Sequence, residues 1–120
     1  MDKSVKIGLM GLGTVGTGVC KILQDNREVI FERAGTEFEI AKILVRDLTK
    51  PRAVEVEEGL LTTNPADILE DDGISVVVEL MGGLEPAYQY IEAALSRGKH
   101  VVIFIIPGFG TYLLWQDRKV

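Results

Sequence analysis

The sequence predicts an α/β fold in which helices cover a parallel sheet, and three observations lead to this prediction. Short runs rich in Val, Ile and Leu alternate with longer segments whose apolar residues repeat at helical spacing. Glycines, prolines and an Asp-Gly pair separate these segments, as expected where connections are short. The first apolar run ends in a Gly-x-Gly-x-x-Gly turn that leads directly into a helical segment. Strands that alternate with helices in this way form right-handed crossovers and therefore a parallel sheet.

The first half of the chain contains two expected strands with a long helix between them. Residues 4–10 form an apolar run that becomes apolar on both faces at its end, which is typical of a central parallel strand. A helix is expected over residues 14–33, because its apolar positions fall largely on one face, and Gly35 suits its end. A second strand is expected over 38–45, followed by a polar loop over 46–51.

The second half repeats the alternation. A short strand at 60–62 precedes a brief helix, for which Asn64 suits the N-cap and Pro65 the first helical position. The remaining elements are a β-branched strand over 74–80, a helix over 86–97 and a fifth strand over 100–106. The fold class is thus a Rossmann-type doubly wound parallel sheet, partial, with about five strands.

Composition excludes several classes of function. The chain has 120 residues, 47% of them hydrophobic and 26% charged, which suits one globular domain. A net charge of −5 argues against nucleic-acid binding, because a phosphate backbone would be repelled. No apolar run reaches the roughly 18 residues of a membrane span, and no signal segment precedes the first strand. With a single cysteine, which fits a reducing compartment, we expect a cytoplasmic protein that binds neither nucleic acid nor membrane.

The glycine turn is the main candidate binding site. Gly11 permits a tight turn, and Gly13 lets a pyrophosphate approach the backbone without meeting a side chain. Gly16 lets the following helix lie close to the strand, and the N-terminus of that helix offers N–H groups to an anion. The sequence therefore favours a dinucleotide site, with a purely structural tight turn as the alternative.

The end of the second strand is where a dinucleotide site meets the adenosine ribose. An acidic residue there favours the ribose hydroxyl of NAD, whereas an arginine accommodates the 2′-phosphate of NADP. This chain has Arg46 and then Asp47, with Lys50 and Arg52 close behind. Arg46 is therefore the candidate phosphate ligand, and Asp47 leaves the use of NAD open. A solvated loop of mixed charge is the alternative to both.

Five other residues have a functional and a structural interpretation. Gly82 and Gly83 follow the fourth strand, where the backbone either approaches the nicotinamide half of the cofactor or simply turns. His100 follows a helix and begins a strand, so we interpret it as structural. Cys20 lies among small apolar residues of the first helix and is interpreted as core. Thr62 ends a strand near the expected site, where threonines often cap helices.

Taken together, several motifs resemble the nucleotide-binding domain of homoserine dehydrogenase over about residues 4–102. The motifs are Gly-Leu-Gly-Thr-Val-Gly at 11–16, Leu-Val-Arg-Asp at 44–47, Leu-Leu-Thr-Thr at 60–63, Val-Glu-Leu-Met-Gly-Gly at 78–83, Glu-Pro-Ala at 85–87 and Gly-Lys-His-Val-Val at 98–102. The resemblance implies an oxidoreductase that reduces aspartate 4-semialdehyde to homoserine, in threonine, methionine and isoleucine biosynthesis. It also implies NADP(H) as cofactor, with NAD(H) as the alternative.

The resemblance also implies particular cofactor contacts. It places Leu12, Gly13, Thr14 and Val15 against the cofactor, and Arg46 against its 2′-phosphate. The full candidate cofactor site, with the glycines discussed above, is Gly11, Leu12, Gly13, Thr14, Val15, Gly16, Arg46, Gly82 and Gly83. No catalytic residue and no metal ligand is expected within this chain.

The similarity ends after residue 102. The family continues there into Thr-Ala-Asn-Lys, whose lysine serves the active site, whereas residues 103–106 of this chain are Ile-Phe-Ile-Ile. We therefore expect a dinucleotide-binding domain over 1–102 and an atypical apolar tail over 103–120, whose origin as a shifted frame, a fragment or a design stays open. The isolated chain is expected to lack catalysis. A non-catalytic dinucleotide-binding module, a non-functional truncated product and another oxidoreductase are the alternatives.

The apolar tail has two expected outcomes. Pro107, Gly108 and Gly110 favour a turn that returns residues 112–115 to the domain. Without such a return, the apolar strand before the turn would be an exposed sheet edge and would pair with another molecule. Self-association through the tail is therefore the only macromolecular interaction that the sequence suggests.

Overall fold

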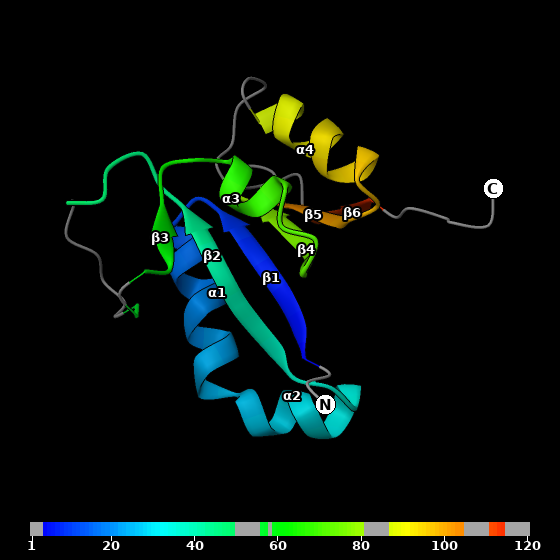
Figure 1. Cartoon of the computed structure of the whole chain (residues 1–120). Helices are drawn as coiled ribbons and strands as arrows, with labels where there is room; N and C mark the ends of the chain where they lie inside the picture. The colour runs from blue at the N-terminus through cyan, green and yellow to red at the C-terminus, as the bar shows by residue number, and fades with distance from the viewer. Residues whose placement is uncertain (1–3, 50–55, 58, 81–86, 105–110, 115–120) are drawn as a thin grey trace.

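A computed structural model of the chain describes residues 4–49, 56–57, 59–80, 87–104 and 111–114 (Figure 1). In chain order its elements are β1 (Val5–Met10), α1 (Thr14–Asp25), α2 (Arg27–Ala34), β2 (Phe38–Leu44), β3 (Leu61–Thr62), α3 (Ala66–Leu69), β4 (Ile74–Glu79), α4 (Ala87–Ser96), β5 (His100–Phe104) and β6 (Thr111–Leu114). The strands form one sheet in the order β3-β2-β1-β4-β5-β6. Strands β1 to β5 are parallel, which confirms the predicted α/β doubly wound fold.

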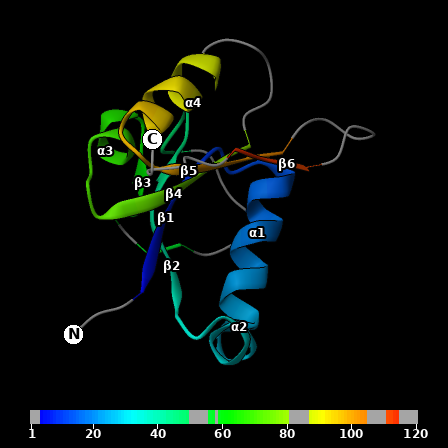
Figure 2. The same cartoon turned by 90° about the vertical axis from the view of Figure 1, so that its right-hand side faces the viewer.

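The helices cover both faces of the sheet. Figure 2 shows α1 and α2 on one side, and α3 and α4 on the other. Each face has its own apolar core, because successive side chains of a strand point to opposite sides. In β1, Ile7 and Leu9 pack on the core that includes Cys20 of α1, whereas Met10 packs on the core that includes Ile68 of α3.

Gly8 of β1 allows α3 to approach the centre of the sheet. A β-carbon on Gly8 would come within 2.5 Å of Cγ2 of Ile68, which is fully buried. Glycine inside a strand often marks such a close approach. The short helix α3 is thereby held directly against β1.

The single helix predicted over residues 14–33 is two helices, and this part of the prediction is wrong. Asn26 lies between them with φ −116° and ψ 23°, outside helical geometry. Its backbone N–H and its side-chain amide both donate to the carbonyl of Ile22, each at 3.0 Å. Asparagine side chains compete with the backbone for such bonds and favour helix ends. The chain therefore turns at Asn26, and α2 runs at an angle to α1 (Figure 1).

The start of α3 shows the predicted capping. The Asn64 side chain accepts a hydrogen bond from the N–H of Ala66 at 3.1 Å, and Pro65 has helical dihedral angles. Thr62 accepts the N–H of Asn64 at 3.0 Å and donates its hydroxyl to Asp67 at 2.5 Å. Asn64 therefore caps α3 as predicted, whereas Thr62 bonds to the residue before the helix and to the side chain of Asp67, and no N–H of the described helix bonds to it.

The tail returns to the sheet. Strand β6 pairs antiparallel with β5, with Val101 opposite Leu114 and Ile103 opposite Tyr112. Of the two expected outcomes, the structure shows the one in which the tail covers the edge of β5. Strand β5 itself continues past residue 102. The division into a domain over 1–102 and a tail over 103–120 stays a prediction, and so does self-association.

Candidate functional site

The glycine turn lies at the carboxyl end of β1 and leads into α1. Gly11 has φ 115°, a backbone conformation that side-chain-bearing residues rarely adopt. Gly13 is exposed, and a β-carbon on it would meet no atom within 4 Å. A β-carbon on Gly16, in contrast, would lie 2.7 Å from the carbonyl oxygen of Gly11. The turn is thus tight at its base and open at Gly13, where a ligand would approach the backbone.

The N-terminus of α1 has the features of an anion site. Gly13 is the N-cap residue, and no side chain makes a capping hydrogen bond there. No acidic residue lies in the first turn of the helix. The N–H groups of the first turn are therefore available to a ligand or solvent, and no carboxylate of the first turn itself offsets the positive end of the helix dipole. These observations suit the pyrophosphate of a dinucleotide.

Backbone hydrogen bonds bring the other candidate segments to the same edge of the sheet. The N–H of Gly11 donates to Leu44 at the end of β2, at 2.9 Å. The N–H of Leu80, just after β4, donates to Met10 at the end of β1, at 3.0 Å. The carboxyl ends of β1, β2 and β4 therefore meet at one place. Ligands of doubly wound sheets bind at this edge, where the strand order reverses.

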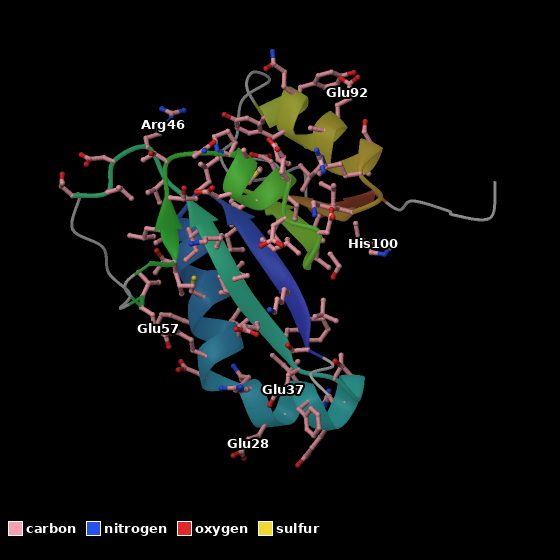
Figure 3. All side chains as sticks on the ribbon, in the orientation of Figure 1. Glu28, Glu37, Arg46, Glu57, Glu92 and His100 are labelled. Atoms are coloured by element: carbon pink, nitrogen blue, oxygen red, sulfur yellow. The ribbon has the colours of Figure 1, made fainter. Side chains whose placement is uncertain are left out.

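Arg46 lies at this edge, two residues after Leu44. Its side chain is exposed at the end of β2, as Figure 3 shows. Among the described residues, the structure gives Arg46 no hydrogen bond or ion pair. The guanidinium is thus available to an anionic ligand. The acidic residue beside it is engaged differently: Oδ1 of Asp47 accepts the N–H of Thr49 at 2.8 Å and its hydroxyl at 2.7 Å.

The remaining candidates lie in several places. The structure describes the backbone of Thr14 and Val15 at the start of α1, and Leu12 is half-buried in the turn. Gly82 and Gly83 lie outside the described residues, so their role stays a prediction. Cys20 is fully buried in the core beneath α1, as interpreted from the sequence, and burial raises the pKa of its thiol.

His100 lies at the opposite end of the sheet from the glycine turn. It begins β5, opposite Val76 in β4, and it is half-buried. The carboxyl ends of the strands, where the glycine turn lies, are therefore distant from it along the sheet (Figure 3). This position agrees with a structural role.

Sequence reasoning missed the role of Lys99. Only 3% of this residue is exposed, and its ammonium donates to the carbonyls of Asp71 and Ile74, each at 2.6 Å. Burial lowers the pKa of Lys99, while the nearby Asp71 and Asp72 raise it in part. The side chain joins the start of β5 to the turn before β4, so its role is structural.

The turn at Asp47 was not predicted either, although the sequence contains a signal for it. Asp-x-Thr is a pattern typical of turns closed by a side-chain hydrogen bond.

A cavity of about 460 Å³ lies on the α1 face of the sheet and is separate from the glycine turn. Its lining residues come from α1, the start of α2, β2 and the segment before β3, and include Cys20, Arg27, Phe38 and Leu60. Neither the glycine turn nor Arg46 lines it.

Within the described residues, no three His, Cys, Asp or Glu side chains gather in a possible metal site. In the same part of the chain, no helix is both long and apolar enough to cross a membrane.

The fold and the glycine turn define the class: this is a dinucleotide-binding domain with a Rossmann-like α/β sheet. A family model described as "Homoserine dehydrogenase, NAD binding domain" matches residues 11–104. The chain belongs to this family, and the predicted resemblance is confirmed. The family also establishes that the cofactor is a nicotinamide dinucleotide.

Known relatives agree with this assignment. The chain is 44% identical over 120 residues to a homoserine dehydrogenase of Bacillus subtilis, an alignment that covers 98% of this chain and 28% of that protein. This alignment extends past residue 102, where the similarity was expected to end. It is 46% identical over 101 residues to the Synechocystis enzyme, covering 82% of this chain and 22% of the relative. The chain therefore spans about a quarter of the length of these relatives.

Solved structures show the same fold. The structure of S. aureus homoserine dehydrogenase at pH 7.5 superposes with a TM-score of 0.78 at 42% identity, covering 82% of this chain and 26% of that one. The structure of homoserine dehydrogenase from Thiobacillus denitrificans superposes with a TM-score of 0.77 at 48% identity, covering 84% of this chain and 23% of that one. The chain thus corresponds to the NAD-binding part of an oxidoreductase family.

Proposed function

We propose that this domain binds NADP(H) in preference to NAD(H), through the glycine turn and Arg46. The observation that carries the proposal is the exposed Arg46 guanidinium at the end of β2, on the same edge as the glycine turn. The N–H of Gly11 bonds to Leu44, so the two parts of the site are fixed relative to each other through two strands. A planar guanidinium can bind phosphate with two parallel hydrogen bonds.

The contacts in the site follow from this arrangement. The backbone N–H groups from Gly13 to Gly16 would hold the pyrophosphate, with Leu12 and Val15 beside the cofactor. Arg46 would receive the 2′-phosphate of the adenosine ribose. Gly82 and Gly83, after β4, would lie toward the nicotinamide half. The openness above Gly13 supports this assignment, because a cofactor needs the space that a side chain would take.

We further propose that the whole protein reduces aspartate 4-semialdehyde to homoserine. Family membership supports this proposal, because the relatives that the chain matches are named homoserine dehydrogenases. The bound dinucleotide would supply the hydride, and this domain would hold it in position. The residues that bind the substrate are proposed to lie outside the described part of this chain.

Cofactor preference is tested by titrating the chain and its Arg46→Ala variant with NADPH and with NADH. We expect the variant to bind NADPH more weakly, by about tenfold or more, since a lost charge-assisted hydrogen bond is worth about 1.5–3 kcal/mol and about 1.4 kcal/mol is a factor of ten. Binding of NADH should remain nearly unchanged. Arg33→Ala is a matched control, because Arg33 is also exposed but lies in α2, away from the glycine turn. Equal losses for both cofactors would show that Arg46 does not receive the 2′-phosphate.

A further inference from the structure

The loop after β2 contains a turn that involves the side chain of Asp47. One carboxylate oxygen, Oδ1, accepts both the backbone N–H of Thr49 at 2.8 Å and its hydroxyl at 2.7 Å. An aspartate that bonds to the backbone two residues ahead closes a local turn of defined shape. The direction of the backbone immediately after Arg46 is thereby fixed by a side chain.

The backbone immediately before Arg46 is fixed as well. The N–H of Val45 donates to the carbonyl of Thr62 in β3 at 2.8 Å, which continues the sheet pairing beyond the end of β2. Val45 is also buried, with 7% of its surface exposed. Arg46 is therefore an exposed residue between two anchored neighbours. Its flexible side chain begins from a backbone position that has little freedom, so less entropy is lost when it binds an anion.

The same hydrogen bonds engage one oxygen of the carboxylate that could otherwise favour NAD. A carboxylate at the end of the second strand can accept a ribose hydroxyl, which favours NAD, and its charge repels a 2′-phosphate. In this structure Oδ1 of Asp47 already accepts two hydrogen bonds from Thr49. These bonds hold the carboxylate within its own loop.

We propose that Asp47 is a positioning residue for cofactor choice: its turn with Thr49 holds Arg46 in place for the 2′-phosphate, and Asp47 does not itself bind the ribose. The proposal rests on the proposed function, in which Arg46 receives that phosphate. It adds two residues, Asp47 and Thr49, as determinants of the preference for NADPH.

Three variants of the full chain test this proposal. Asp47→Ala removes the turn, and we expect it to weaken NADPH binding about fivefold while NADH binding changes less than about twofold. Asp47→Asn removes the charge, which repels the phosphate, but keeps an acceptor for Thr49, so it should bind NADPH as tightly as the wild type or more tightly; a loss like that of Asp47→Ala would contradict the proposal. Thr49→Val keeps the shape of the side chain and loses only the hydroxyl. It should weaken NADPH binding in the same direction as Asp47→Ala, by a smaller factor.

The measurements are dissociation constants for NADPH and NADH, with a thermal melt of each variant. The proposal is overturned if Asp47→Ala binds NADPH as tightly as the wild type or more tightly, since the carboxylate would then only repel the phosphate. It is also overturned if Asp47→Ala weakens the binding of NADH but not of NADPH, because Asp47 would then bind the ribose. Equal losses of both cofactors with a lowered melting temperature would show general damage to the fold and would also contradict it.

Failure of the proposed function gives a different result. In that case, Arg46→Ala would leave NADPH binding unchanged, or the wild-type chain would bind neither dinucleotide. If Arg46→Ala weakens NADPH selectively but Asp47→Ala does not, the proposed function stands and only the role of Asp47 is wrong.

Discussion

Gly16 and Gly11 are so close that a β-carbon on Gly16 would lie 2.7 Å from the carbonyl oxygen of Gly11. Real β-carbon contacts essentially never fall below 3.0 Å. A Cβ at the same position would also come within 3.3 Å of Leu80, just after β4. The third glycine of the motif is thus required by the packing of α1 on the turn that ends β1. This steric requirement is separate from any contact with a cofactor.

The first prediction follows from this contact. Gly16→Ala should lower the free energy of unfolding by about 1–3 kcal/mol, because the atom that the new methyl meets is backbone and cannot move aside freely. Gly18→Ala is the matched control, since it lies in the same helix and a β-carbon there meets no atom within 4 Å. The free energy of unfolding of the control should rise by up to about 1 kcal/mol, because alanine has a higher helix propensity than glycine. Urea unfolding of both variants measures the difference, and equal effects would contradict the proposed packing.

The second prediction separates binding from stability at Gly13. Gly13→Val should abolish NADPH binding, because a branched side chain would occupy the space where the pyrophosphate approaches the backbone. The fold should tolerate the change, since the position is open and its φ of −84° suits any residue. Calorimetric titration and a thermal melt of the same preparation test both parts. Unchanged affinity would exclude the turn as the cofactor site.

The third prediction concerns Cys20 at alkaline pH. Burial raises the pKa of its thiol above the ordinary value of 9.0, so the unfolded chain loses this proton before the folded chain does. Stability from the buried neutral thiol is therefore complete below pH 9.0 and is lost as the pH rises from there through the folded-state pKa. Cys20→Ala should be less stable at neutral pH but should lose less stability between about pH 8 and 10. Denaturant unfolding across that range gives the free energy of unfolding against pH for the wild type and for Cys20→Ala. If the two proteins lose stability equally with rising pH, the thiol is not buried in its neutral form.

The fourth prediction concerns catalysis. The chain as printed should not reduce NADP with homoserine, because residues 103–106 differ from the Asn-Lys segment that the resemblance implies for the active site. Purified protein that binds NADPH in a titration should thus give no homoserine-dependent absorbance change. The B. subtilis homoserine dehydrogenase is a suitable positive control. Steady turnover by this chain would require catalytic residues within it.

Much of the fold follows from local patterns along the chain. The strand over β1, the glycine turn and the start of α1 were predicted because their signals lie within a few neighbouring residues. The capping of α3 by Asn64 was predicted for the same reason. The break at Asn26 was missed because Ile30 lies on the same helical face as Val19 and Ile22, although α2 itself buries no residue. Only the hydrogen bonds of Asn26 to Ile22 show where the first helix ends.

The sequence by itself thus determined the alternation of the five parallel strands with helices, the glycine turn and the family to which the chain belongs, but it predicted neither the break between α1 and α2 nor strand β6. The tertiary structure alone decided which residues meet. Parallel pairing of β1 with β2 joins Gly11 to Leu44 and so places Arg46 on the edge of the glycine turn. Lys99 bonds to carbonyls 28 and 25 residues away, which no local pattern indicates. The physical reason is that periodicity and turn chemistry act between neighbours in sequence, whereas sheet pairing and burial act between residues that only the fold brings together.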